Sequence, residues 1–580
     1  MLTQINELQN SFKKAGFVYK SSITCIIGIV LISLLQLCPY RLMWQVGGDD
    51  LSYLSHAFTI GLDFDLDYSN EPSNRDSGSN EVPRHPMGPG IMSAPFVAFF
   101  SIFDRLTGNP VIQNHALYSG SWSYFGFLFS TIFYYFLGIL LYYKGILKIK
   151  LISPGIAFLL LSSSGAAYYA MNRFTMGHSF EFFLLGAIFW STVSLWRAVF
   201  CDSVSPQRYR TFSALHICTA CAMILSLTVR PANINILLLP PILLLGLFTL
   251  KDTITWSLFW KHILSIYIWT LIFATIFFFF NYSIYGSIYP TFSVMYRGTN
   301  LLTALRIDDT NTGLAILSTV THIIRNAVYL PKVIFGSEFG LLYSNPLSII
   351  GILLLMYRIV KSATMYFMPR TVLVTLVLIY CAVPISIVLL WKSPASSFGY
   401  RYLFSLFPIG IIGYILWRKS INRWGLISKS IQLMIVLLSV ISIMSQIFFS
   451  MSQKLEVGEK LNAFGVYHEL SANGYQLALA EELFNPHTWL LMLAKKTPGF
   501  VTFNLVQYMG SEPSNISKSL GIYDEYKRVT TIKMKDGEHG VLIFSPGIYL
   551  LQALVLFILI NMMAYFYCRV YIIRKEAPHD

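Results

Sequence analysis

Long apolar runs dominate the chain, and short polar links, most of them basic, separate them. Each run approaches the roughly 20 residues that a helix needs to cross the hydrocarbon core of a bilayer. No small-residue cleavage site follows the first run, so we interpret it as a spanning helix and not as a signal peptide. The pattern predicts about twelve spanning helices, near residues 21–43, 118–143, 151–170, 180–200, 211–229, 232–250, 262–282, 345–360, 371–391, 402–417, 428–450 and 547–568.

Composition supports the same class. Apolar residues make up 55% of the 580 residues and charged residues only 12%, whereas a soluble domain carries about 25% charge. The predicted fold class is therefore an all-α polytopic membrane protein, without a nucleic-acid partner despite the net charge of +14. The seven cysteines suit free thiols. The C-x-x-C pair Cys218 and Cys221 lacks a second pair, so no metal site is predicted.

Basic links give the orientation, because Lys and Arg gather on the cytoplasmic side of membrane proteins. With both termini cytoplasmic, seven basic groups fall on that side, beginning at Lys13, Lys144, Arg208, Lys251, Arg358, Arg418 and Arg569. The same assignment exports the loops 45–117, 283–344 and 451–546. It predicts a transmembrane module over 1–450, an exported subdomain over 451–546, and a last helix with a cytoplasmic tail over 547–580.

Two features of the exported loops suggest structure. Ile91 to Phe103 is apolar but short, and Pro95 interrupts it, so we expect an interfacial helix on the outer leaflet. In the third loop, Val529 to Met534 and Val541 to Phe544 flank a turn-like sequence. They predict a hairpin in a small mixed α/β segment.

Adjacent carboxylates at Asp49 and Asp50 come a few residues after the first apolar run. Like charges side by side at a low-dielectric boundary are costly, which favours a general base held at the membrane surface. A solvated helix cap is the alternative. The acids at 63, 65 and 67 lack the Gly and Glu of a calcium loop, so we interpret them as solvated.

Further polar groups follow at predicted outer helix ends. His85 lies in a Pro- and Gly-rich step, where it either orients a substrate or is structural. Arg173, His178 and Glu181 share one short link, where ordinary polar capping of the helix ends is the alternative to a functional role. Glu338 lies in a loop that contains two glycines and precedes a predicted helix. Arginine is uncommon on an exported face and binds phosphate bidentately, which makes the outward arginines candidate phosphate ligands, with snorkelling as the alternative: Arg173, Arg230, Arg297, Arg306, Arg325 and Arg401.

The order of these motifs resembles the bacterial GT-C membrane glycosyltransferases, which include protein O-mannosyltransferases and aminoarabinose transferases. The resemblance covers roughly residues 20–420, and the region 451–546 matches nothing in it. It rests on Asp49-Asp50, His85-Pro86-Met87-Gly88, Arg173 with His178 and Glu181, Gly340-Leu341-Leu342 followed by Pro346, and Phe398-Gly399-Tyr400-Arg401.

The resemblance implies an inverting transfer of a sugar from a polyprenyl-phosphate donor to an acceptor hydroxyl of a glycan, lipid or protein. It places the reaction at the outer face of a bacterial inner membrane. Asp50, or else Asp49, takes the role of base. Arg401, Arg230 and then Arg173 stabilise the leaving phosphate, with His178, Glu181, His85, Arg297 and Glu338 as further substrate-binding candidates. Some members of the family need a divalent cation, and the acids here do not decide it.

A secondary transporter or lipid flippase is the main alternative function. Such proteins keep ionisable residues near the bilayer midplane and show repeat symmetry. Here the helix centres are nearly free of such residues, His216 being an isolated exception, and no repeat is visible. The pattern therefore favours an enzyme over a conduit, with a non-catalytic scaffold as the third possibility.

Overall fold

A computed structural model gives the fold. It describes residues 28, 49–71, 82–83, 85–108, 112–113, 116–117, 121–149, 151–171, 176–200, 208–250, 256–286, 320–321, 323–336, 340–361, 367–391, 400–420, 425–456, 531–533, 539–541 and 562–563.

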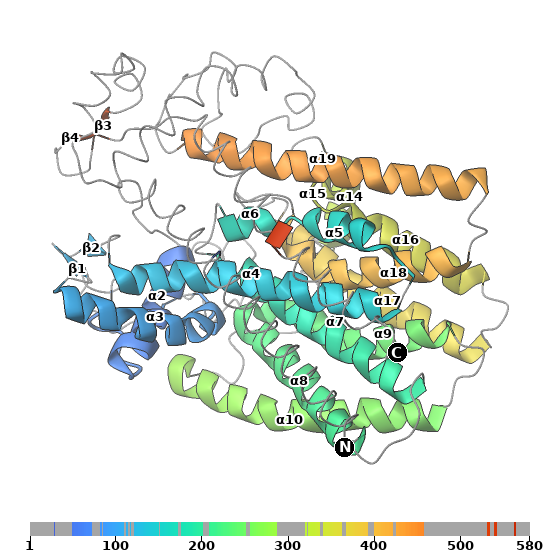
Figure 1. The fold of residues 1–580 in the computed structure, drawn as a ribbon, viewed down its shortest axis with the longest axis horizontal. Coiled ribbons are helices and arrows are strands. Elements are labelled where there is room, and N and C mark those ends of the chain that lie inside the picture. The colour runs from blue at the N-terminus through green and yellow to red at the C-terminus, as the bar shows by residue number, and fades with distance from the viewer. Residues whose placement is uncertain are drawn as a thin grey trace, which may run out of the picture.

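Helices lying side by side in a bundle dominate the described part of the chain (Figure 1). Within the described ranges, seven helical stretches are long and apolar enough to cross a membrane, so the chain is an integral, multi-pass membrane protein, as predicted. They are α4 (Trp122–Ile149), α7 (His178–Phe200), α8 (Arg208–Val229), η2 with α9 (Pro231–Leu238 and Leu239–Phe248), α10 (Trp256–Tyr285), α17 (Phe367–Trp391) and α19 (Leu426–Glu456).

The predicted count of twelve helices stays a prediction. Nearly all of the runs 21–43 and 547–568 lies outside the described residues. The runs at 345–360 and 402–417 form α16 (Pro346–Lys361) and η4 with α18 (Arg401–Leu406 and Phe407–Ser420), which are short helices. These two pack in parallel. A Cβ at Gly410 or Gly413 would collide with the facing backbone at Leu347 or Gly351, so small residues allow the close approach.

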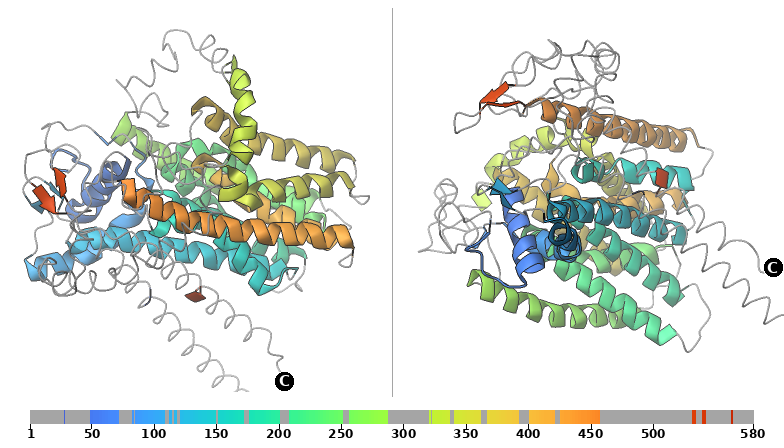
Figure 2. Two further views of the ribbon diagram at one scale, coloured as in Figure 1. Left: turned by 90° about the horizontal axis from the view of Figure 1, so that it is seen from above. Right: turned by 60° about the vertical axis from the view of Figure 1, so that its left-hand side comes forward.

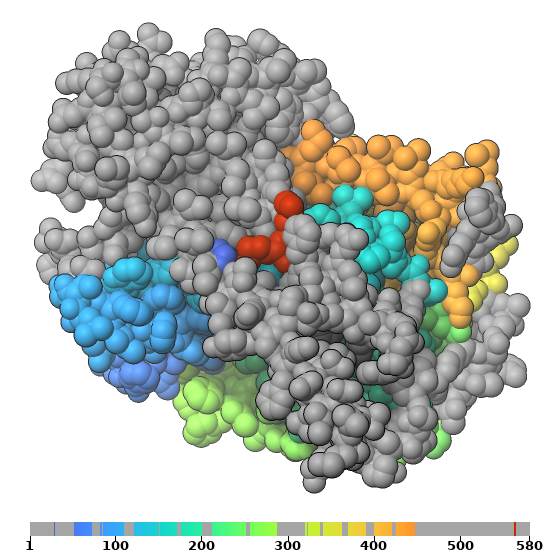
Figure 3. All heavy atoms as spheres, viewed as in Figure 1, coloured from blue at the N-terminus to red at the C-terminus, as the bar shows by residue number. Residues whose placement is uncertain are grey.

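The predicted continuous helix over 151–170 is wrong, because the chain breaks into α5 (Pro154–Ser162) and α6 (Ala166–Met171). The flanking helices α4 and α7 run parallel, so α5 and α6 return the chain across the bundle. A break inside a membrane frees carbonyl groups that need donors. From α19, Gln446 Nε2 donates to Ser162 O at 3.0 Å and Ser442 Oγ donates to Ser163 O at 2.9 Å. Figure 3 shows α19 beside α5 on one face.

The helices α4, α7, α16 and α18 all end on the right of Figure 1, and each has a basic residue in its last turn. We call this the basic end; Lys148, Arg197, Lys361 and Lys419 lie in those last turns. At the opposite end, α7 begins and α8 and α10 finish. α10 and α19 lie on opposite sides of the bundle (Figure 2) and expose apolar side chains, as lipid-facing helices do.

The first loop packs against the end of the bundle opposite the basic end. It contains α2 (Asp49–Phe58), the π-helix η1 (Thr59–Asp63) and α3 (Gly88–Thr107). α3 corresponds to the predicted interfacial helix but is longer, because Pro89 is tolerated in its first turn. It exposes Phe99, Ile102, Phe103 and Leu106. An apolar outer face is what an interfacial helix presents to lipid, and that placement remains a prediction.

Short strands and helices complete the described chain. β1 (Ile112–Gln113) pairs with β2 (Ala116–Leu117), and β3 (Thr531–Lys533) pairs antiparallel with β4 (His539–Val541). The latter pair lies at the predicted hairpin, although β4 precedes most of the predicted second strand. Other residues of 451–546 beyond α19 lie outside the described part, so the domain division stays a prediction. The remaining elements are η3 (Ala327–Tyr329), α14 (Leu330–Phe335) and α15 (Leu341–Ser344).

Candidate functional site

Three interruptions of the helices meet at the end of the bundle opposite the basic end: the start of α7, the junction of α8 with η2, and the start of η4. The local sequence explains the central one. A residue before proline is pushed out of helical geometry, and Arg230, which precedes Pro231, has φ −151° and ψ 100°. α8 therefore stops at Val229, and Arg230 lies at the break.

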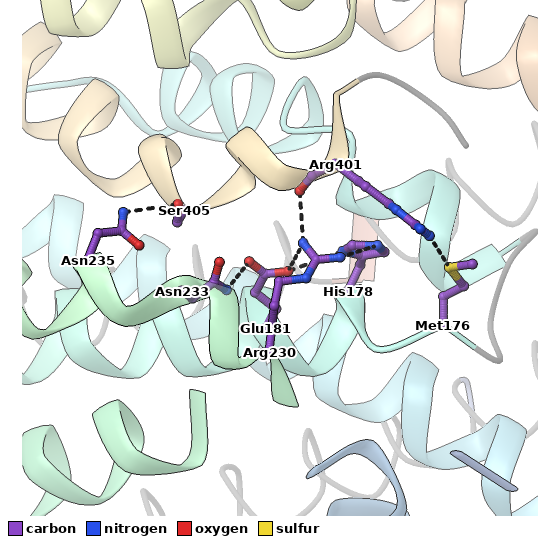
Figure 4. Close-up of polar contacts among 8 residues, drawn as sticks. All are labelled: Met176, His178, Glu181, Arg230, Asn233, Asn235, Arg401 and Ser405. Atoms are coloured by element: carbon purple, nitrogen blue, oxygen red, sulfur yellow. Dashed lines mark hydrogen bonds and ion pairs between the residues drawn. The ribbon is translucent and has the colours of Figure 1, made fainter. Parts of the chain in front are cut away.

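Glu181 is the centre of a buried ion-pair cluster (Figure 4). Its Oε2 accepts hydrogen bonds from Arg230 Nη1 at 3.2 Å and from His178 Nδ1 at 3.1 Å. Its Oε1 accepts one from Asn233 Nδ2 at 2.5 Å. The Glu181 side chain is only 1% exposed. Buried carboxylates are tolerated when they are paired and hydrogen-bonded, and here both oxygens are engaged.

The same contacts fix the state of His178. Its Nε2 lies 3.2 Å from Arg230 Nη2. A guanidinium group only donates hydrogen bonds, so Nε2 must accept and the ring proton must be on Nδ1, which donates to Glu181. His178 is therefore a neutral imidazole with both nitrogens occupied. The ring also packs against Tyr169, with centroids 4.1 Å apart.

Arg401 joins the cluster through its backbone and extends its guanidinium group away from it. The Arg401 carbonyl oxygen accepts from Arg230 Nη1 at 3.0 Å, whereas its own Nη1 lies 3.3 Å from Met176 Sδ. Both guanidinium carbons lie over the Tyr402 ring, at 5.1 Å for Arg230 and 5.4 Å for Arg401. With one carboxylate, two guanidinium groups and a neutral histidine, the cluster has one positive charge in excess.

The segment from His85 to Gly90, which we call the wedge, lies between α2 and the end of α8. A Cβ at Gly88 would collide with the backbone of Thr228 and Val229. It would lie only 2.6 Å from the carbonyl oxygen of Thr228. At Gly90 it would collide with α2, lying 2.9 Å from Ala57 N. Only glycine permits such backbone approaches. The wedge places α2 next to the backbone that carries Arg230.

His85 contributes its carbonyl group to a second buried network. His56 Nε2 donates to the His85 oxygen at 3.0 Å, and the Tyr285 hydroxyl donates to the same oxygen at 3.1 Å. The other ring nitrogen, His56 Nδ1, lies 2.7 Å from the Tyr68 hydroxyl. Burial lowers the pKa of His56 to about 4. The His85 ring lies beside that of Tyr53, with centroids 5.9 Å apart.

The predicted base belongs to this region by its backbone. Asp49 and Asp50 are the first two residues of α2. The structure describes their backbone and not their side chains. Tyr53, one turn later, faces His85. The acids at 63, 65 and 67 are exposed, in agreement with the solvated interpretation. A hydrogen bond from the Ser69 backbone amide to Asp67 lowers the pKa of that carboxyl group.

Other predicted residues remain apart from the cluster. Arg173, Arg297, Arg306 and Glu338 lie outside the described residues, and Arg325 is exposed on a different segment. Within the described ranges, no group of three or more His, Cys, Asp or Glu side chains is placed to hold a metal ion. The structure thus brings together His178, Glu181, Arg230 and Arg401.

An apolar groove of about 500 Å³ opens beside the wedge, between α8 and α10. Its walls include Met87, Ile224, Thr228, Phe277 and Ile284. Asp65 is its acidic member. Thr228 lies two residues before Arg230, so the groove runs from between two spanning helices toward the segment that carries the charged cluster.

Sequence reasoning missed His56, Tyr68, Asn233, Met176 and Tyr402. Asn233 had a usable signal, because it follows Arg230 by three residues and therefore lies on the same turn of η2. His56 also had one: a histidine one turn from the end of a short amphipathic helix. Tyr402 and Met176 meet the arginines only through tertiary packing.

Comparisons with known proteins give structural matches alone. No family model matches the chain, and no curated protein matches it. Among solved structures, an Archaeoglobus fulgidus oligosaccharyltransferase tethered to an acceptor peptide matches with 13% identity and a TM-score of 0.39, over 78% of this chain and 60% of that one. This chain therefore spans 60% of the length of that relative.

Two further structures are similar. ArnT from Cupriavidus metallidurans matches with 11% identity and a TM-score of 0.38, over 96% of this chain and 78% of that one. The archaeal oligosaccharyltransferase AglB from Archaeoglobus fulgidus, in complex with an inhibitory peptide and a dolichol-phosphate, matches with 12% identity and a TM-score of 0.35, over 90% and 74%. All are GT-C membrane glycosyltransferases, the superfamily that the motif order resembles. At these TM-scores the likeness carries no argument of its own.

Proposed function

We propose that this chain is an inverting glycosyltransferase that moves a sugar from a polyprenyl-phosphate donor to an acceptor hydroxyl at the membrane face away from the basic end. One observation carries the proposal: the motifs at 85–90, 178–181, 230 and 401, far apart in the sequence, converge at that end next to the helix that begins with the acidic pair.

The excess positive charge suits a lipid-linked phosphate. When the sugar leaves, the phosphate gains negative charge, and fixed cations at a poorly hydrated surface stabilise that charge strongly. We assign this role to Arg401, whose guanidinium group extends out of the cluster toward Met176. Arg230 divides its donors among Glu181, His178 and the Arg401 carbonyl, so it holds the η4 segment and adds its charge.

Asp50 is the preferred base, and Asp49 is the alternative. A base must reach the proton of the acceptor hydroxyl while that oxygen attacks the anomeric carbon from the face opposite the phosphate. The first turn of α2 supplies both acids, and the wedge holds α2 against the Arg230 segment. Holding donor, acceptor and base in one cavity also supplies the proximity contribution to the rate.

The groove between α8 and α10 suits the lipid part of the donor. Its walls are almost entirely apolar, and it lies between helices that cross the bilayer, so a polyprenyl chain enters from lipid without crossing water. The basic end fits the cytoplasmic side. We therefore propose that both termini lie in the cytoplasm and that the reaction takes place at the outer face of a bacterial plasma membrane, in the synthesis of an envelope glycan or glycolipid.

Sugar transfer by the purified protein tests the proposal. The assay supplies polyprenyl-phosphate sugars and compares Asp49→Asn and Asp50→Asn with the matched control Asp67→Asn, an exposed loop acid. We expect one of the first two variants to lose about 10²-fold or more in turnover and the control to keep its rate. Wild-type turnover in both acid variants would refute the base assignment. Lipid export without a glycosyl product would favour the transporter.

A further inference from the structure

We propose that His56 is a positioning residue for the transfer reaction: it locks α2 to the segment 85–90 and so sets the distance between the acidic pair and Arg230. The inference rests on the proposed function. His56 belongs to neither the charged cluster nor the acidic pair, yet its side chain is fully buried. It contacts groups from three other parts of the chain.

The hydrogen bonds around His56 have a single consistent polarity. A carbonyl oxygen only accepts, so the bond to His85 O at 3.0 Å requires a proton on Nε2. In a neutral ring Nδ1 then has only a lone pair, and the Tyr68 hydroxyl at 2.7 Å must donate to it. The Tyr285 hydroxyl also donates to His85 O, at 3.1 Å. Among the residues that the structure describes, the titratable groups that face the ring are Tyr68, Tyr285 and His85.

A continuous path of contacts leads from His56 to the charged cluster. The His85 carbonyl group fixes the start of the segment, and three residues later Gly88 lies against the backbone of Thr228 and Val229. Arg230 is the next residue. Gly90 returns to α2 and lies against His56 and Ala57. The segment 85–90 therefore contacts both α2 and the end of α8 through its backbone, and His56 connects it to α2.

A histidine suits this position because its planar, rigid ring donates a hydrogen bond from one nitrogen and accepts one at the other. A Gln amide places a donor near the position of Nε2, whereas an Asn amide reaches only about as far as Nδ1. Phe keeps the volume and loses both bonds. These three substitutions separate hydrogen-bond geometry from packing.

The test measures kcat and KM for a polyprenyl-phosphate sugar in His56→Gln, His56→Asn and His56→Phe. We expect kcat to fall about tenfold or more in the Asn and Phe variants, because a small misplacement of reacting groups costs about that much or more. KM for the donor stays near the wild-type value, and His56→Gln stays within about threefold in kcat. Equal kcat in the Gln and Asn variants, or unchanged kcat in the Phe variant, would overturn the proposal.

Tyr68→Phe keeps the test decisive if the His56 variants do not fold. The substitution keeps the packed ring of residue 68 and removes only the hydroxyl group that donates to His56 Nδ1. We expect kcat to fall and KM to stay unchanged. Unchanged kcat would contradict the positioning role. Nitrogen-15 NMR of the wild-type protein is independent of activity: the His56 signals should show a proton on Nε2 and none on Nδ1 at neutral pH. The opposite tautomer would overturn the lock even if the protein proved not to be a transferase.

Discussion

Two buried polar clusters lie near opposite ends of the bundle and differ in kind. Toward the basic end, His216 on α8 and His262 on α10 share a hydrogen bond of 3.0 Å, and Ser265 Oγ lies 2.9 Å from the His216 Nδ1. This cluster joins two regular helices. At the other end, Glu181 and Arg230 form a charged pair at a helix break and connect α7, η2 and η4.

The difference separates scaffold from site. A neutral hydrogen bond between continuous helices contributes about 1 kcal/mol and costs little to bury. A buried ion pair is expensive, and apolar residues of similar volume often replace it without loss of stability. The charged cluster also holds the carbonyl group of Arg401. Charge and broken helices together therefore favour this end as the location of the proposed site.

Glu181→Ala should have the largest effect, because it leaves the Arg230 charge without its buried carboxylate. Such losses cost about 3–5 kcal/mol. We expect a large fall in thermal stability and loss of sugar transfer, measured by thermal unfolding in detergent and by the transfer assay. Glu181→Gln keeps the side-chain volume and one acceptor oxygen for these donors, so it should lose less stability. Equal stability in Glu181→Ala and the wild type would contradict the importance of the pair.

Gly88→Ala should come next. Its Cβ would overlap the backbone of Thr228 and Val229, and overpacking typically costs about 1–3 kcal/mol. Because the end of α8 must shift, kcat should fall more than stability alone explains. Gly155→Ala is the matched control: nothing lies within 4 Å of its Cβ position, and alanine favours a helix. The wedge has no role if the two variants have equal rates.

Acid should weaken the end of the bundle that contains His56. The folded pKa is about 4 against an ordinary 6.5, so the unfolded chain binds this proton more readily. Well above pH 6.5, burial of His56 therefore leaves the free energy of unfolding unaffected by its titration. As the pH falls from there to about 4, that free energy decreases progressively. At pH 5 the contribution is about 2 kcal/mol. Unfolding titrations of wild type and His56→Gln test this, and parallel pH curves would show that His56 has an ordinary pKa.

His216→Phe should have the smallest effect. It removes a neutral hydrogen bond and costs about 1 kcal/mol, while the contacts of Glu181 and Arg230 stay intact. We expect slightly lower thermal stability and wild-type kcat. A large fall in kcat with normal stability would show that the basic end takes part in the reaction.

The sequence predicted the helical bundle and several residues that the structure brings into one buried cluster. Apolar length predicts spanning helices such as α4, α7 and α10, because the bilayer sets that length. Hydropathy does not resolve the break between α5 and α6, since Ser442 and Gln446 of α19 satisfy it through tertiary contacts.

Polar residues at helix ends are visible in the sequence, and so His178, Glu181, Arg230 and Arg401 were all predicted. Their pairing was not, and it changes their roles. Glu181 and His178 are occupied by protein partners, so we infer that they support the proposed site, and their substrate-binding role stays a prediction. The sequence could not predict the contacts of His56, because its partners are a backbone carbonyl group and a distant tyrosine.

Single-turnover sugar transfer by Asp50→Asn and His216→Phe, with the melting temperature of each, tests most directly whether the reaction belongs to the end with the acidic pair. We expect Asp50→Asn to lose about 10²-fold or more in rate with a normal melting temperature, and His216→Phe to keep its rate with a lower one. The reverse pattern, a fast Asp50→Asn protein and a slow but stable His216→Phe protein, would contradict the assignment.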